Sequence, residues 1–158
     1  MKKIIVTGGL GFIGSNLIEL LLKKNFYVIN IDKGTYSSNL YNTKDFISSK
    51  RYKFIKLDIA NKKISEVFRK YKPSGVFNVA AETHVDRSID NAQAFIKTNL
   101  SGVHNLLESV RKLDKKTKNK LKFLQVSTDE VYGDIPKNKK ASENYNYNPS
   151  SPYSASKA

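Results

Sequence analysis

The sequence predicts an α/β fold built around a doubly wound parallel sheet, and two observations predict it. Five short apolar runs alternate with segments of helical periodicity, which is the pattern of repeated βαβ units. The first run also leads through closely spaced glycines into a helix, as at the tight strand-to-helix turns of such folds. The expected strands are Lys3–Thr7, Phe26–Ile31, Tyr52–Leu57, Gly75–Val79 and Leu121–Ser127.

Helical segments fill the gaps between these runs. A helix is expected over Ser15–Lys24, and a second one carries the apolar stripe from Ile64 to Tyr71. A long helix is expected from Ile89 to about Lys112, and a last one begins at Pro152. Right-handed crossovers between parallel strands then place helices on both faces of the sheet.

Composition excludes several classes of protein. A chain of 158 residues suits one domain with a sizeable core, and 39% hydrophobic residues are typical of a soluble globular protein. The absence of cysteine excludes a disulfide framework and suits a reducing cytoplasm. No run approaches the roughly 20 apolar residues of a membrane span. No metal site is expected, because His84 and His104 lack the spacing of metal ligands.

The formal charge of +14 raises the question of nucleic-acid binding. The lysines are dispersed, and the densest cluster lies at the end of the predicted long helix, where cations favour the helix dipole. No nucleic-acid-binding motif accompanies them, so we expect no nucleic-acid partner. A positive field instead attracts an anionic small molecule such as a nucleotide.

The glycine turn after the first strand predicts a phosphate site. Glycines let the backbone turn tightly, let a pyrophosphate approach closely and let the helix pack against its strand. The N-terminus of the following helix then presents its N–H groups and partial positive charge to the phosphates. The residues expected to bind a dinucleotide here are Gly8, Gly11, Phe12, Ile13 and Gly14.

Asp32 ends the second strand, 18 residues after Gly14. A carboxylate near this separation binds the ribose hydroxyls of the adenosine half, and it repels a 2′-phosphate, which favours NAD over NADP. Lys33 tempers that preference, because its amine can neutralise a phosphate, and it belongs to the same predicted cofactor site. The alternative role of Asp32 is a turn residue that begins a loop.

Two further strand ends carry candidate cofactor residues. Asp58 can accept a hydrogen bond from an adenine amino group while Ile59 packs on the ring, or Asp58 can cap the segment after Ala60. After the fourth strand, the small side chains of Ala80 and Ala81 let a cofactor lie against the backbone.

The fifth strand ends in Thr128, Asp129 and Glu130. Two adjacent carboxylates after an apolar strand are unfavourable, because burial costs solvation and the charges repel each other. A solvated turn is the alternative interpretation. Tyr153 and Lys157 follow four residues apart, so they share one face of the last helix. Ligands bind beyond the carboxyl ends of parallel strands, where all these residues are expected.

Four motifs resemble the dTDP-glucose 4,6-dehydratases, a family of extended short-chain dehydrogenase/reductases with a Rossmann-type fold. They are Thr7–Gly14, Ala80–Ile89, Ser127–Gly133 and Ser151–Lys157. The glycine turn and the Tyr-x-x-x-Lys pattern are shared by the superfamily, whereas the Thr-Asp-Glu triplet resembles sugar 4,6-dehydratases specifically. Two departures are Thr83, where the family usually has Ser, and Gly34, where Leu is usual.

The resemblance implies a reaction and a role for each residue. NAD-dependent oxidation at C4 of the sugar is followed by elimination of water across C5 and C6 and by reduction at C6. Tyr153 takes the C4 hydroxyl proton, while Lys157 stabilises the phenolate and holds the nicotinamide ribose. Glu130 is the base at C5 and Asp129 the acid at the C6 hydroxyl. Thr128 bonds the C4 oxygen, and Thr83 keeps the hydroxyl of a substrate-binding position.

The resemblance also implies that residues 1–158 are an incomplete NAD-binding Rossmann domain. Members of the family are roughly twice this length and carry a C-terminal substrate domain. We therefore expect this fragment alone to be inactive, and the homodimer expected for the family to be in doubt here. The alternatives are a dehydratase for another nucleotide sugar, such as UDP-glucose, and a non-catalytic NAD-binding fragment.

Overall fold

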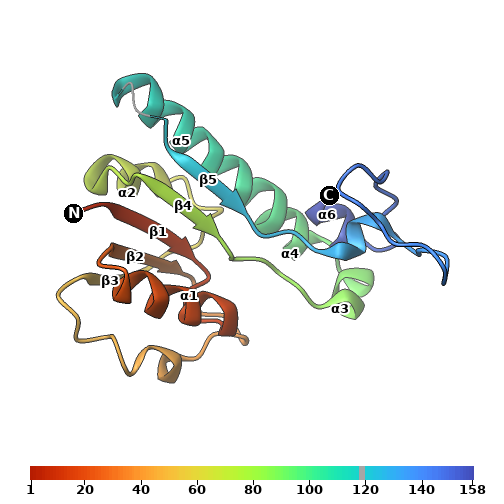
Figure 1. The fold of residues 1–158 in the computed structure, drawn as a ribbon, viewed down its shortest axis with the longest axis horizontal. Coiled ribbons are helices and arrows are strands. Elements are labelled where there is room, and N and C mark those ends of the chain that lie inside the picture. Colours follow the sequence, from red (N-terminus) through yellow and green to blue (C-terminus); the bar gives the residue numbers. More distant parts are fainter. Residues whose placement is uncertain (118–119) are drawn as a thin grey trace. The chain divides into compact units, whose positions relative to one another are not determined.

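The computed structural model describes residues 1–117 and 120–158 (Figure 1). The chain divides into two compact units. The sheet unit comprises Met1–Ala80 and Ser101–Val126, and the helical unit comprises Ala81–Leu100 and Ser127–Ala158. The chain passes from one unit to the other three times, after Ala80, after Leu100 and after Val126.

The sheet unit is a five-stranded parallel sheet of order β3-β2-β1-β4-β5 (Figure 1). This order confirms the predicted α/β, Rossmann-type architecture, with the chain winding outward from β1 in both directions. In register, Ile5 of β1 lies between Ile29 of β2 and Val76 of β4. The strands are β1 (Lys3–Thr7), β2 (Tyr27–Asp32), β3 (Tyr52–Lys56), β4 (Gly75–Asn78) and β5 (Lys122–Gln125).

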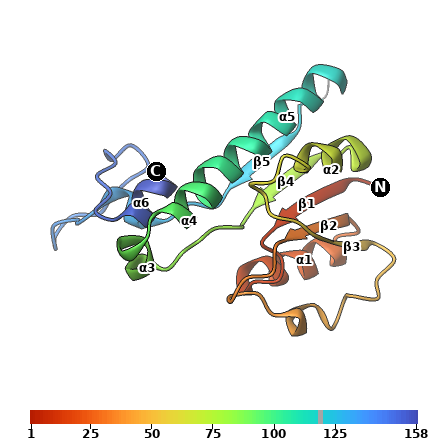
Figure 2. The same ribbon diagram turned by 180° about the vertical axis from the view of Figure 1, so that it is seen from behind.

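Helices cover both faces of this sheet, as Figures 1 and 2 show. Helix α1 (Phe12–Lys23) packs Ile18, Leu21 and Leu22 against one face. Helices α2 (Ile64–Tyr71) and α5 (Val103–Thr117) pack against the other. Because both faces are covered, the central strands are apolar nearly throughout, which explains the continuous apolar runs in the sequence.

Helix α1 begins three residues earlier than the predicted Ser15. Gly11 is its N-cap in extended conformation, so the turn is complete at that residue. Helix α2 has the predicted bounds and ends at Lys72, which adopts the left-handed conformation with φ 47°. Pro73 follows, and it cannot continue a helix.

The single long helix predicted from Ile89 to Lys112 is wrong. Helix α3 (Val85–Asp90) ends at Asn91, whose side chain accepts a hydrogen bond from the N–H of Gln93 at 2.9 Å and so starts a new turn. The short α4 (Gln93–Phe95) and a π-helical segment, η2 (Ile96–Gly102), precede α5. The π segment inserts a residue, as π-bulges do at sites where side chains must be redirected.

Strand β5 ends two residues before the predicted Ser127, since its partner β4 ends at Asn78. The helical unit then contains the 3₁₀ turn η3 (Asp129–Tyr132) and helix α6 (Pro152–Lys157), together with α3 and α4. Across residues 1–117 and 120–158, every helix is too short or too polar to cross a lipid bilayer.

Candidate functional site

The glycine turn of the sheet unit is packed too tightly for side chains at Gly8, Gly9 and Gly14. Gly8 has φ 70°, and a Cβ there would lie 2.8 Å from the Ala80 Cα. A Cβ on Gly14 would lie 2.2 Å from the Gly8 carbonyl oxygen. These contacts hold the turn against the end of β4 and hold α1 against the turn.

Gly11 differs from the other three glycines of the turn. A Cβ at Gly11 would meet nothing closer than the Gly8 oxygen at 3.4 Å, which is ordinary contact. The protein itself therefore has no steric need for glycine at this position. The space beside Gly11 suits close approach of a ligand to the backbone, which is the role the sequence predicts for it.

Helix α1 begins without a side-chain cap, and its first main-chain hydrogen bond is donated by Ser15 to Gly11 at 3.0 Å. The N–H groups of its first turn are thus available to an anion. The two residues that open the helix, Phe12 and Ile13, are 83% and 59% exposed. Exposed apolar side chains beside uncapped N–H groups are consistent with a site for a ligand that has both phosphate and apolar parts.

Asp32 is the last residue of β2 and is 7% exposed. Its Oδ2 accepts a hydrogen bond from the Leu10 N–H at 3.0 Å, while its Oδ1 accepts from the Gly34 N–H at 2.8 Å and from the Ser38 hydroxyl at 3.0 Å. The carboxylate therefore ties the glycine turn to the loop after β2. The turn role is thus present, and ribose binding by Asp32 and Lys33 stays a prediction.

Asp58 follows β3 and accepts the Ala60 N–H at 2.9 Å, so the turn-forming alternative is present there too. The neighbouring Ile59 is 3% exposed and belongs to the core on the α2–α5 face. Its side chain is also where a Cβ on Gly102 would collide, at 2.6 Å. Ile59 consequently offers little side-chain surface to an adenine ring.

Ala80 and Ala81 both follow β4 and are partly buried, and Ala80 is the residue that contacts the glycine turn. Ala81 opens the helical unit. Thr83, the predicted substrate residue, is exposed in the segment before α3.

In the helical unit, Thr128 caps the 3₁₀ turn that carries both carboxylates. Its Oγ1 accepts the Glu130 N–H at 3.3 Å and donates to the Asp129 carboxylate at 3.3 Å. Asp129 and Glu130 occupy the first turn of η3 and are exposed. A helix start favours negative charge, which lowers the cost of placing two carboxylates side by side.

Helix α6 carries Tyr153 and Lys157, one helical turn apart as predicted. Tyr153 is 7% exposed and packs edge-to-face on Phe95, with 6.3 Å between ring centroids. Lys157 is partly buried, and this burial lowers the pKa of its amine. A desolvated amine and a buried phenol thus lie one helical turn apart on α6.

Comparison with known proteins decides the family. The family model described as GDP-mannose 4,6 dehydratase matches residues 5–158. The chain belongs to this family. A dTDP-glucose 4,6-dehydratase from Haemophilus influenzae is 46% identical over 100% of the chain and 49% of its own length. The chain thus spans about half the length of the curated relatives it matches.

Solved structures agree with the family assignment. The dTDP-glucose 4,6-dehydratase from Bacillus anthracis, in complex with NAD, has a TM-score of 0.85 at 39% identity, covering 99% of this chain and 47% of its own. DesIV from Streptomyces venezuelae, a dTDP-glucose 4,6-dehydratase with NAD and TYD bound, has a TM-score of 0.85 at 35% identity. It covers 98% of this chain and 48% of its own.

The sequence analysis did not identify the side chains that hold α6, the helix with the Tyr-x-x-x-Lys pattern. The Ser88 hydroxyl accepts the Tyr153 N–H at 3.1 Å, and the Ser127 hydroxyl donates to the Lys157 carbonyl at 2.9 Å. Asn99 donates to the Ser156 hydroxyl at 2.8 Å. Only Asn99 gave a signal, because Asn is unfavourable in the middle of a helix.

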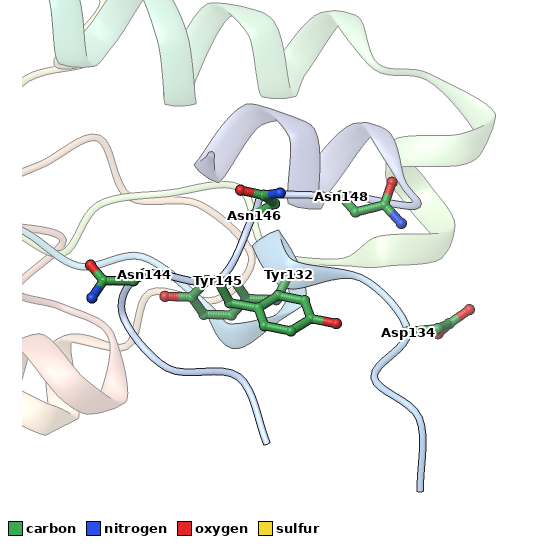
Figure 3. A pocket seen from close by; sticks show the side chains of 6 residues that line it. All are labelled: Tyr132, Asp134, Asn144, Tyr145, Asn146 and Asn148. Atoms are coloured by element: carbon green, nitrogen blue, oxygen red, sulfur yellow. The ribbon is translucent and has the colours of Figure 1, made fainter. Parts of the chain in front are cut away.

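A pocket of about 470 Å³ lies in the helical unit, between the end of η3 and the loop before α6 (Figure 3). The rings of Tyr132 and Tyr145 pack edge-to-face at its wall, 6.2 Å apart. None of the predicted site residues lines it. Its lining residues are Tyr132, Asp134, Asn144, Tyr145, Asn146 and Asn148.

The lowered pKa of Lys157 can be measured by NMR titration of isotope-labelled lysine side chains. We expect the Lys157 amine to titrate at lower pH in the folded chain than in the urea-unfolded chain, because burial disfavours its charged form. Since the unfolded state then binds more protons, this group adds stability as pH rises between the two pKa values. Equal titration midpoints for the Lys157 amine in the folded and unfolded chains would contradict its burial.

Proposed function

We propose that this chain is the NAD-binding part of a nucleotide-sugar 4,6-dehydratase that acts on dTDP-glucose. The observation that carries the proposal is the Thr128-Asp129-Glu130 triplet beyond β5, in a unit that also holds the Tyr153–Lys157 pair. The full-length relatives with which the chain shares 43–46% identity carry the same activity in their names.

The residues present fit NAD. The open space at Gly11 and the uncapped start of α1 would take the pyrophosphate, and Asp32 would take the ribose hydroxyls. Asp32 already accepts three hydrogen bonds, yet a carboxylate offers about four lone-pair sites, so one remains for a ribose hydroxyl. Bound NAD supplies a hydride acceptor and donor.

The side chains of the helical unit would perform the proton transfers. Tyr153, as phenolate, takes the proton of the C4 hydroxyl when C4 is oxidised, and the Lys157 ammonium stabilises the phenolate charge. Thr128 donates a hydrogen bond to the C4 oxygen. The new C4 ketone acidifies the neighbouring C5–H, which is otherwise a very weak acid.

Elimination needs one base and one acid at adjacent carbons. Glu130, ionised, removes the C5 proton, and Asp129, protonated, delivers a proton to the C6 hydroxyl, which leaves as water. Reduction at C6 then completes the 4-keto-6-deoxy sugar. The two adjacent carboxylates of η3 thus need opposite protonation states in the same turnover.

The homodimer implied for the family also stays a proposal. The aliphatic side chains of Ile89, Ile96 and Leu100 in the helical unit are 66%, 53% and 48% exposed. Apolar side chains exposed on neighbouring helical segments are typical of surfaces that a partner covers.

The reaction is tested by mass spectrometry of the protein that carries this chain, incubated with NAD and dTDP-glucose. We expect a product lighter than the substrate by one water. UDP-glucose in a parallel reaction tests the alternative substrate. A protein that binds NAD yet forms no product from either sugar would support the non-catalytic alternative instead.

Cofactor choice gives a separate prediction. We expect NAD to bind at least about tenfold more tightly than NADP, because the Asp32 carboxylate opposes a 2′-phosphate and like charges in contact cost several kcal/mol. Asp32→Asn keeps an acceptor oxygen and removes the charge, so it should narrow the ratio of the two dissociation constants in calorimetry. Glu66→Gln, an exposed acid on α2, is the matched control and should leave the ratio unchanged.

A further inference from the structure

Helix α6 (Pro152–Lys157) is held in place by contacts with α3, α4 and η3 of the helical unit. Because Tyr153 and Lys157 both lie on it, whatever fixes this helix also fixes the two side chains.

One N–H group in the first turn of α6 has no acceptor within the helix. Pro152 has no N–H, and the Ser154 N–H is accepted by the Ser151 hydroxyl at 3.0 Å in a capping box. The first main-chain bond of the helix is Ala155 to Ser151 at 2.9 Å. The Tyr153 N–H is thus the one first-turn donor that the helix cannot satisfy from its own residues.

Ser88 satisfies that donor from α3, 65 residues earlier in the chain. Its Oγ accepts the Tyr153 N–H at 3.1 Å and donates to the Val85 carbonyl at 2.6 Å. Since the single hydroxyl proton goes to Val85, a lone pair is directed at Tyr153. Ser88 is completely buried, so water cannot replace the bond without a rearrangement.

Two other contacts hold the rest of the helix. Asn99 donates to the Ser156 hydroxyl at 2.8 Å, and its amide also pairs with the backbone of Glu82 at 2.9 and 3.0 Å. Ser127 donates to the Lys157 carbonyl at 2.9 Å. The Tyr153 carbonyl accepts the hydroxyl of Ser156 within the same helix at 2.7 Å, whereas the Tyr153 N–H is held from another segment, by Ser88.

We propose that Ser88 is a positioning residue for the dehydratase reaction, which sets the place of the Tyr153 phenol by accepting the Tyr153 N–H. The effect of Ser88 on turnover rests on the proposed function. Its effect on the position of Tyr153 rests on the hydrogen bond alone. Ser88 touches neither the sugar nor the reacting atoms in this role. It acts through the backbone of the helix that carries the phenol.

The test compares Ser88→Ala and Ser88→Thr with a matched control in the protein that carries this chain. Ser109→Ala is the control, because Ser109 is also buried and its hydroxyl also donates to a main-chain carbonyl, that of Asn105 at 2.7 Å. Ser109 lies on α5 and has no bond to α6. The measurements are amide hydrogen exchange at Tyr153, kcat and KM for dTDP-glucose, and NAD affinity.

For Ser88→Ala we expect about tenfold faster exchange at Tyr153, as the loss of one buried hydrogen bond allows. We expect kcat to fall by roughly 10-fold to 100-fold with KM and NAD affinity unchanged, since small displacements of catalytic groups have effects of this size. Ser88→Thr, which keeps the hydroxyl, should restore both exchange and kcat. Ser109→Ala should change neither.

Two results would overturn the proposal. One is that Ser88→Ala exchanges faster at Tyr153 but keeps the kcat of the unaltered protein. The hydrogen bond would then stabilise the helix without affecting catalysis. The other is unchanged amide exchange at Tyr153 in Ser88→Ala, which would show that Ser88 does not hold the Tyr153 N–H. If the unaltered protein forms no product from dTDP-glucose, the proposed function fails, and the exchange measurement still decides the structural part separately.

Discussion

Gly14→Ala is expected to destabilise the sheet unit by about 3 kcal/mol or more, the upper part of the range for overpacked sites. The new Cβ would lie 2.2 Å from the Gly8 oxygen and 2.8 Å from the Gly9 Cα. Both neighbours are backbone atoms, which cannot rotate away as the end of a side chain can. Urea denaturation followed by circular dichroism measures the change.

Gly11→Ala provides the matched control for this prediction. Its Cβ would have only the Gly8 oxygen nearby, at 3.4 Å, so we expect stability close to that of the unaltered chain. Its NAD affinity should nevertheless fall, because the methyl group occupies the space proposed for the pyrophosphate. Equal denaturation midpoints for Gly14→Ala and Gly11→Ala would show that the close contact at Gly14 is not what the structure indicates.

Glu130→Gln is expected to lower turnover of dTDP-glucose by about 10²-fold to 10⁴-fold, the usual contribution of a general base. The amide cannot remove the C5 proton, whereas oxidation at C4 depends on Tyr153 and Lys157. A quenched reaction should therefore contain a sugar that has lost two hydrogens but no water. Mass spectrometry distinguishes this species from both substrate and product.

The control for that variant is Glu143→Gln, which removes an exposed carboxylate elsewhere in the helical unit. It should turn over normally. Asp129→Asn should stall at the same stage as Glu130→Gln, because the C6 hydroxyl then lacks its acid. Normal dehydration by both the Asp129 and the Glu130 variants would remove the carboxylate pair from the mechanism.

Much of the sheet unit could be predicted because its physics is local. The central strands β1, β2 and β4 are buried on both faces and mostly apolar, and each of the five apolar runs marked a strand to within a residue or two. The strand ends were predicted equally well: Gly8 follows β1 directly, and Asp32 is the last residue of β2. Alternating strands and helices predict a parallel sheet, and in such a sheet the residues that follow the strands lie at the same edge.

The helical unit was predicted less well because its structure depends on distant contacts. The Asn99 side chain pairs with the backbone of Glu82, 17 residues earlier, and no periodicity within the helical segment indicates that contact. The bond between Ser88 and Tyr153 likewise joins residues 65 positions apart. Asn91 breaks the long helix through a local cap, a role that Asn also plays in many turns.

The two outer margins of the sheet are protected to different degrees. Along β3, Lys53 and Lys56 extend into solvent, and charged side chains of this kind discourage pairing between molecules. Along β5, Lys122 is the one charged residue, and Leu124 is 47% exposed. The β5 margin therefore carries fewer charged side chains than the β3 margin, and it is the margin that favours pairing with a further strand.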